Sequence, residues 1–216
     1  MQKNVEKMSI NYSPNFNMQK RSPAKVKYII FHYTGMNSEI SAIRRLTSKN
    51  SGVSCHYFIK NNGQIIQIVP DLFIAWHAGV SFWKKDKLLN KSSIGIEISN
   101  PGHENGYKKY NSEQIKSIIR LSKKLKQKYK IKKENVLGHS DIAPLRKKDP
   151  GEKFPWKLLN KEKICLWHNL SERKCKQLRK IKLSESKKFY KLLHKFGYKV
   201  PNKISDKIKV YKNFQR

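Results

Sequence analysis

Short runs of apolar, β-branched and aromatic residues recur through the first two-thirds of the chain, separated by polar turns. Residues 26–31 (VKYIIF) are long enough for a buried central strand. Residues 53–59 and 64–69 flank an Asn-Asn-Gly turn, which is the pattern of a β-hairpin. Residues 93–99 (SIGIEIS) and 135–137 predict two more strands. Together these segments supply the strands of one sheet.

Two amphipathic patterns with helical spacing lie between the predicted strands. The first follows a cap at Asn37 or Ser38 and runs to about Ser48, and the second runs from a cap at Asn111 to about Lys130. Their apolar faces consist of Ile40, Ile43 and Leu46 in the first helix, and of Ile115, Ile118, Ile119, Leu125 and Tyr129 in the second. This alternation predicts an α/β fold with a mixed central β-sheet flanked by helices.

The two ends of the chain differ in composition from this central part. Residues 1–24 are polar and rich in Asn, which predicts an extended N-terminal segment before an α/β domain at residues 25–158. Residues 159–216 form a small, lysine-rich, all-helical region with few apolar positions, so we expect it to pack against the α/β domain. The helices predicted in this region are residues 160–180, 184–196 and 203–214.

The charge is strongly positive, with 48 Lys and Arg against 15 Asp and Glu and a formal net charge of +33. Nucleic acid, anionic lipid and acidic cell-wall polymer would all be attracted by such a field. The lysines are spread along the whole chain, and no helix-turn-helix, zinc-finger or RNP motif is present, so specific nucleic-acid binding is not expected. A coding bias towards Lys, Ile and Asn would explain the same composition.

No stretch approaches the roughly 20 apolar residues of a membrane helix, and the start of the chain lacks the apolar block of a secretory signal. Both observations favour the cytoplasm. Cys55, Cys165 and Cys175 show no CxxC spacing, so neither a disulfide framework nor a cysteine zinc site is indicated. A bridge between Cys165 and Cys175 is the alternative to the simpler expectation of a reduced compartment.

Three features carry candidate chemistry. His32 ends a predicted core strand, where open sheets usually keep their ligands. Glu97 interrupts an apolar strand, and a buried carboxylate is costly unless it is paired or used. His139, Lys147 and Asp149 share one proline-containing loop, residues 138–151, which must fold back for the histidine and the aspartate to reach one ion. An ordinary polar loop is the alternative at this point.

These residue types together fit metal-assisted hydrolysis. A catalytic zinc usually has three protein ligands and a water, and two histidines with a carboxylate are a standard set. Zinc makes hydroxide available near neutral pH. The reaction then needs a base for the proton of the water and a cation for the developing oxyanion, for which Glu97 and Lys147 are the natural candidates. The pattern predicts a zinc hydrolase.

The order of the motifs FHYTG, VSCHYFI, AWHAG, SIGIEI, GHSDIAP and KDPG resembles zinc-dependent N-acetylmuramoyl-L-alanine amidases of type 2. This family is related to phage lysozyme amidases and to peptidoglycan recognition proteins, and the resemblance covers about residues 9–160. It implies a mixed-sheet amidase domain that binds one Zn²⁺ per chain. The implied reaction is hydrolysis of the amide bond between muramic acid, or its 1,6-anhydro form, and L-alanine in peptidoglycan or muropeptides.

The resemblance also assigns the site residues. His32, His139 and Asp149 match the zinc ligands, Glu97 matches the residue that handles the water proton, and Lys147 matches the residue that stabilises the oxyanion. Family members that act only as peptidoglycan recognition modules lose zinc ligands, and none is lost here. That non-catalytic module is one alternative function, and a basic nucleic-acid-binding protein is the other.

Three further residues carry weaker expectations. His56 lies in a strand motif and is expected to be packed and hydrogen-bonded, not a ligand. Trp76 and His77 match a segment that borders the substrate groove and are candidates for substrate binding, although Trp76 could equally pack.

The tail, residues 189–215, is similar to the first part of small helical peptidoglycan-binding modules of periplasmic or outer-membrane members, and it stops before the last helix. This similarity implies a location in the cell envelope. The missing secretory signal implies the cytoplasm instead. The choice between intact wall and anhydro-muropeptides stays open, and a monomer is expected.

Overall fold

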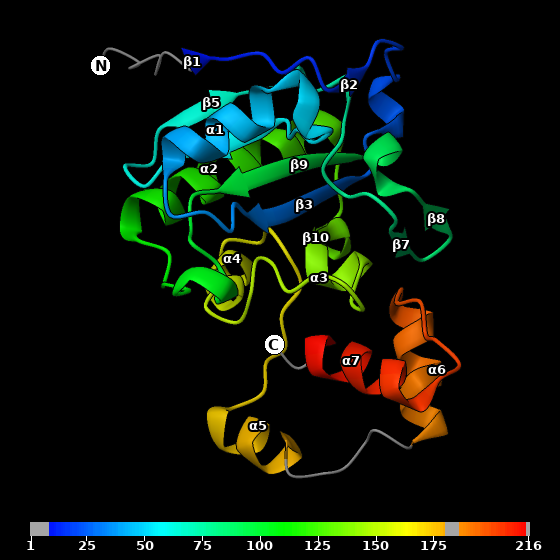
Figure 1. Ribbon diagram of the computed structural model, residues 1–216. Coiled ribbons are helices and arrows are strands. Elements are labelled where there is room, and N and C mark those ends of the chain that lie inside the picture. The colour runs from blue at the N-terminus through cyan, green and yellow to red at the C-terminus, as the bar shows by residue number, and fades with distance from the viewer. Residues whose placement is uncertain (1–8, 180–185, 215–216) are drawn as a thin grey trace.

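The computed structural model describes residues 9–179 and 186–214. Its centre is a six-stranded sheet with the strand order β1-β5-β4-β9-β3-β10 (Figure 1). The strands are β1 (Ser9–Ile10), β3 (Tyr28–Tyr33), β4 (Tyr57–Ile59), β5 (Ile65–Gln67), β9 (Ser93–Ile98) and β10 (Val136–Gly138). The β4–β5 hairpin is antiparallel and every other pair is parallel, so the predicted mixed sheet and its hairpin are confirmed.

Side chains alternate across β3 and β9, which gives the sheet two different faces. Ile29 and Phe31 of β3 point to one face and belong to the same core as Ile118 of the long helix α2 (Ser112–Tyr129). His32 and Glu97 are directly paired neighbours on β3 and β9, and they point to the other face. The sheet therefore separates a mainly apolar side from a side that carries the candidate chemistry.

The two predicted amphipathic helices form where their caps place them. Ser38 accepts a hydrogen bond from the backbone of α1 (Glu39–Thr47), and Asn111 and Gln114 form a capping box at the start of α2. α1 packs Ala42 and Leu46 onto the sheet face that carries His32 and Glu97. Helix α1 therefore forms one wall beside the candidate site.

The remaining elements are short. Two small antiparallel pairs are β2 (Phe16–Asn17) with β6 (Ile74–Ala75), and β7 (Phe82–Trp83) with β8 (Asp86–Lys87). The 3₁₀ helices are η1 (Pro23–Lys25), η2 (Lys49–Ser51), η3 (Leu89–Ser92), η4 (His103–Asn105) and η5 (Lys133–Asn135). The predicted extended N-terminal segment thus supplies β1 and β2 in its described part, while residues 1–8 lie outside the described residues.

The helical region differs from the prediction at its beginning. A single helix was expected over residues 160–180, but α4 (Trp156–Lys161) ends early and α5 (Glu172–Arg179) starts eleven positions later. Ile164 and Cys165, between these helices, are fully buried in the core beside α2. The chain leaves the helix after Lys161, and the non-helical segment that follows places both residues in the core. Residue 180 lies outside the described residues.

Two further helices, α6 (Lys187–Phe196) and α7 (Ile204–Phe214), agree with the predicted pattern, although residues 184 and 185 lie outside the described residues. Both pack beside α3 (His139–Ile142) and the β7–β8 hairpin (Figure 1). The ring of Trp83, which is 1% exposed, lies 4.9 Å from that of Tyr198, so the expected packing against the α/β domain is present. No helix in residues 9–179 and 186–214 is long and apolar enough to cross a membrane.

Polar contacts also join this region to the loop that follows β10. The hydroxyl of Tyr198 donates to Asp141 in α3, and the amide of Asn213 in α7 donates to the carbonyl oxygens of Pro144 and Lys147. The carboxylate of Asp141 in turn accepts from the backbone N–H of Gly138 at 2.8 Å. The tail thus touches both ends of the loop that was predicted to carry the chemistry.

Candidate metal centre and active site

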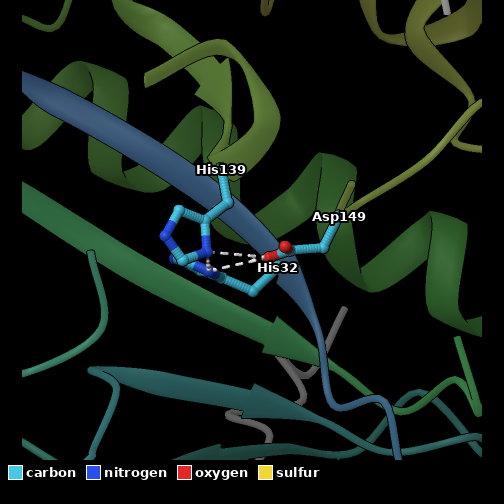
Figure 2. A group of neighbouring side chains, drawn as sticks. All are labelled: His32, His139 and Asp149. Atoms are coloured by element: carbon cyan, nitrogen blue, oxygen red, sulfur yellow. Dashed lines mark hydrogen bonds and ion pairs between the residues drawn. The ribbon is translucent and has the colours of Figure 1, made fainter. Parts of the chain in front are cut away.

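Three buried side chains converge at one end of the sheet. His32 is the penultimate residue of β3, His139 follows the neighbouring strand β10 directly, and Asp149 lies in the loop behind it. The Nδ1 atoms of the two histidines are 2.9 Å apart, and Oδ2 of Asp149 is 3.1 Å from that of His32 and 3.0 Å from that of His139. Figure 2 shows the three side chains pointing towards one another from these separate segments.

The loop between His139 and Asp149 folds back on itself, as its length required. Ser140 donates its backbone N–H to the carbonyl oxygen of Asp149 at 2.9 Å, which closes the loop. The loop is not irregular throughout, because it opens with the short helix α3. This helix places His139 at its first position, directly above the end of β10.

The pKa shifts of His32 and Asp149 suit a metal ion. Burial, together with the neighbouring His139, lowers the pKa of His32 to about 4. Burial alone would raise the pKa of Asp149, but the charges and hydrogen bonds of His139 and His32 hold it below its usual range. Neutral imidazoles and an ionised carboxylate are the forms that bind metal. In the described part of the chain, these three residues are the group of His, Cys, Asp and Glu side chains that could hold an ion.

The hydrogen bonds of His139 show whether these three side chains fit a metal ion. Its Nε2 lies 3.1 Å from the carbonyl oxygen of Ala78, which can only accept, and 3.4 Å from Nη2 of Arg146, which can only donate; the shorter contact, with Ala78, places a proton on Nε2. Nδ1 therefore presents a lone pair to the carboxylate oxygen of Asp149, 3.0 Å away. Two acceptors at that distance repel each other unless a cation lies between them. The donor set fits a divalent metal.

Glu97 and Lys147 share a cavity of about 360 Å³ with the three candidate ligands. Oε2 of Glu97 is buried, and no group among the described residues hydrogen-bonds it. Burial raises the pKa of Glu97, the charge of Asp149 raises it further, and Lys147 opposes the rise. The backbone of Lys147 is held by its N–H on the carbonyl oxygen of Ala143 at 3.1 Å. A carboxylate with one oxygen that lacks a hydrogen-bond partner among the described residues, and a lysine, thus line the cavity beside the candidate metal centre.

Residues 22–152, more than half of the chain, match the sequence profile of a family described as N-acetylmuramoyl-L-alanine amidase. The chain belongs to this amidase family. The family that was inferred from the order of the motifs is therefore confirmed. The chain is 39% identical to N-acetylmuramoyl-L-alanine amidase AmiD of Escherichia coli over 155 residues, which are 66% of this chain and 55% of AmiD.

A second curated relative is 1,6-anhydro-N-acetylmuramyl-L-alanine amidase AmpD of Enterobacter cloacae. It is 36% identical over 104 residues, which are 48% of this chain and 54% of AmpD. The chain thus spans about half the length of the curated relatives it matches.

Solved amidase structures share the fold. AmpDh3 of Pseudomonas aeruginosa superposes with a TM-score of 0.78 at 29% identity, over 92% of this chain and 84% of that one. Escherichia coli AmiD, solved with the substrate anhydro-N-acetylmuramic acid-L-Ala-D-γ-Glu-L-Lys, gives a TM-score of 0.75 at 32% identity, over 92% and 82% of the two chains. The predicted α/β class with a mixed central sheet is confirmed.

The secondary candidates of this amidase-family chain have different surroundings. His56 is buried and accepts a hydrogen bond from the backbone of Gly95 at 3.0 Å, so the expected packed histidine is present. Trp76 lines the cavity, is 36% exposed and donates from Nε1 to Asn17 at 2.8 Å. His77 lines the same cavity but is buried against His32. Substrate contact by Trp76 and His77 stays a prediction.

The cavity also contains a residue that the sequence analysis did not single out. Arg45 in α1 lines the cavity and its neighbour Arg44 does not, although both side chains are exposed. When two arginines are adjacent in a helix, the sequence alone does not indicate which of them faces a site. The position of Leu46, which packs on the sheet, determines the rotation of the helix and so turns Arg45 to the cavity.

Proposed function

We propose that this chain is a zinc-dependent N-acetylmuramoyl-L-alanine amidase. The observation that carries the proposal is the buried triangle of His32, His139 and Asp149 in one cavity with Glu97 and Lys147. The three triangle residues would hold the zinc ion. When bound, zinc supplies Lewis acidity and a water that is acidic near neutral pH.

The side chains around the triangle then have defined tasks. Water adds to the carbonyl carbon of the lactyl group, the C–N bond breaks, and the amine of L-alanine leaves. Oε2 of Glu97 has no hydrogen-bond partner among the described residues, so it is free to take the proton of the water and to pass it to the leaving nitrogen. The ammonium group of Lys147 stabilises the negative charge that develops on the carbonyl oxygen.

The substrate class follows from the relatives. Both curated relatives are amidases of the muramic acid to L-alanine bond, and AmiD was solved with an anhydro-muramyl peptide. We propose muropeptides with a stem peptide as substrates of this chain. We also propose that residues 25–158 are the catalytic domain and residues 159–216 a helical, peptidoglycan-binding-like region, whose residues Ile164 and Cys165 pack into the core of that domain.

The proposal is tested by incubating the zinc-loaded protein with intact sacculi and, separately, with soluble anhydro-muropeptides. We expect release of peptides with a free N-terminal L-alanine, detected by mass spectrometry, and loss of that release after chelation. No release from either substrate, or release that survives chelation, would contradict the proposal. The ratio of the two rates identifies the preferred substrate.

Replacing Lys147 with methionine is expected to lower kcat by about 10²- to 10³-fold, the usual cost of one lost oxyanion-stabilising group. The matched control is Lys148→Met, because Lys148 is half exposed and pairs with Glu104 at 3.0 Å outside the cavity. That control should stay within about twofold of the unmodified protein, since exposed ion pairs contribute little. Both are measured by muropeptide cleavage at saturating substrate. Equal losses in the two variants would refute this role.

Arg45 is expected to bind a carboxylate of the stem peptide. The peptide solved with Escherichia coli AmiD has a γ-linked glutamate after L-alanine, which leaves an α-carboxylate free, and Arg45 presents a guanidinium group at the cavity wall. Arg45→Ala should raise KM about two- to fivefold, the effect of an exposed ion pair worth up to about 1 kcal/mol. The readout is KM for a muropeptide with this carboxylate free, against the same muropeptide with it amidated.

Arg44→Ala is the matched control for charge and helix position, and it should leave both KM values unchanged. A rise in KM for the amidated substrate equal to that for the free acid would show that Arg45 does not read this carboxylate.

A further inference from the structure

The segment between β6 and β7 supports the metal centre from below. His77 lies under His32, with Nδ1 of His77 3.0 Å from Nε2 of His32 and the two rings nearly perpendicular at 82°. The next residue, Ala78, accepts a hydrogen bond from Nε2 of His139 at 3.1 Å. Two consecutive residues thus contact the outward-facing nitrogens of both histidine ligands.

A series of hydrogen bonds runs from Leu89 through Ser93 and His77 to His32. The Leu89 end of this series determines the direction of the hydrogen bonds around His77. The hydroxyl of Ser93 lies 2.6 Å from the carbonyl oxygen of Leu89, which can only accept, so Ser93 donates its single proton there. Oγ of Ser93 must then accept from Nε2 of His77, 3.2 Å away. The neutral His77 ring is left with a lone pair on Nδ1, which accepts the proton on Nε2 of His32.

This order fixes the tautomer of His32. With its proton on Nε2, the neutral ring turns the lone pair of Nδ1 towards His139 and Asp149. That is the form a metal ligand requires. We propose that His77 is a positioning residue, which orients His32 and fixes its tautomer for the metal ion.

Neighbouring residues fix both the backbone and the ring of His77 in this position. The backbone N–H groups of His77 and Ala78 both donate to Oδ1 of Asn90, at 3.1 and 2.7 Å. The ring lies flat over Gly95 of β9, where a Cβ atom would come within 2.3 Å of Cγ of His77. Gly95 therefore makes the room for the ring, and a side chain there would displace it.

Two substitutions of His77 separate positioning from simple packing. Asparagine can place Oδ1 close to the position of Nδ1, so His77→Asn keeps an acceptor for His32. Leucine fills a similar volume but offers no acceptor, so His77→Leu leaves the N–H of His32 without a partner. Loss of a group that orients a metal-bound histidine typically weakens metal binding about 10- to 100-fold.

The experiment measures the Kd for zinc by competition with a chromophoric chelator, without substrate, after circular dichroism has shown that each variant is folded. We expect His77→Leu to weaken zinc binding about 10- to 100-fold and His77→Asn to recover most of it. Ser93→Ala, a smaller change that frees the His77 tautomer, should weaken binding less than His77→Leu does. His103→Leu, at a histidine outside the cavity lining, should leave the Kd unchanged.

The outcomes distinguish this inference from the proposed function on which it rests. An unmodified protein that binds no zinc overturns the proposed function. An unmodified protein that binds zinc, with His77→Leu within about twofold of it, overturns the positioning role alone, since such roles are worth about tenfold or more. If His77→Leu does not fold, Ser93→Ala decides, and an unchanged Kd in that variant also overturns the role.

Discussion

Replacing Asp149 with alanine is expected to remove zinc from the protein and to lower amidase activity by at least about a hundredfold. The side chain is 6% exposed, and its Oδ2 lies within 3.1 Å of both histidine nitrogens, so it is the anionic member of the triangle. Two histidines alone fall short of the three protein ligands that a catalytic zinc usually has. The metal contributes several kcal/mol of transition-state stabilisation, and each 1.36 kcal/mol is tenfold in rate, which gives that lower bound of about a hundredfold.

The measurement combines zinc content by mass spectrometry with muropeptide cleavage by the same preparation. Asp206→Ala is a suitable control, because this carboxylate lies on α7 and pairs with Lys209 away from the cavity. It should retain one zinc per chain and full activity. An Asp149→Ala protein that keeps stoichiometric zinc would show that the triangle is not the metal centre.

Replacing Glu97 with glutamine is expected to lower kcat by about 10²- to 10⁴-fold, the usual contribution of a positioned general base. Glutamine has nearly the same size and hydrogen-bonding reach but cannot accept the proton of the water. Because Glu97 is not part of the triangle, the variant should still bind zinc. Lost catalysis with retained metal therefore distinguishes Glu97 from Asp149.

The assay is muropeptide cleavage by zinc-loaded protein, with zinc content measured in parallel. Glu113→Gln serves as the control, since Glu113 is an exposed residue of α2 that pairs with Lys116. A zinc-loaded Glu97→Gln protein with kcat within about tenfold of the unmodified protein would exclude a general base at this position, whose loss costs more than that.

Much of the site could be predicted because each candidate residue ends or interrupts a strong local pattern. The apolar run of β3 places His32 at its end, and Glu97 is conspicuous because it stands between the isoleucines of β9. Parallel pairing of these two strands then brings both residues side by side. Local sequence patterns define each strand, and one sheet topology is enough to assemble this half of the site.

Other features depend on contacts that are remote in sequence. The orientation of His77 is determined by Ser93 and by the space over Gly95, and neither residue is marked by the pattern around His77. The break between α4 and α5 arises because Ile164 and Cys165 enter the core, which outweighs the helical propensity of a lysine-rich segment. Helix propensity is a local property, whereas burial is decided by the whole fold.

The contacts of Tyr198 with Asp141 and of Asn213 with the carbonyl oxygen of Lys147 connect the tail to the loop that carries the candidate site. Substitutions of Tyr198 or Asn213 are therefore expected to affect the loop that carries Lys147, the residue proposed to stabilise the oxyanion. The helical region thus acts as a brace for this loop, because its hydrogen bonds fix the backbone on both sides of Pro144.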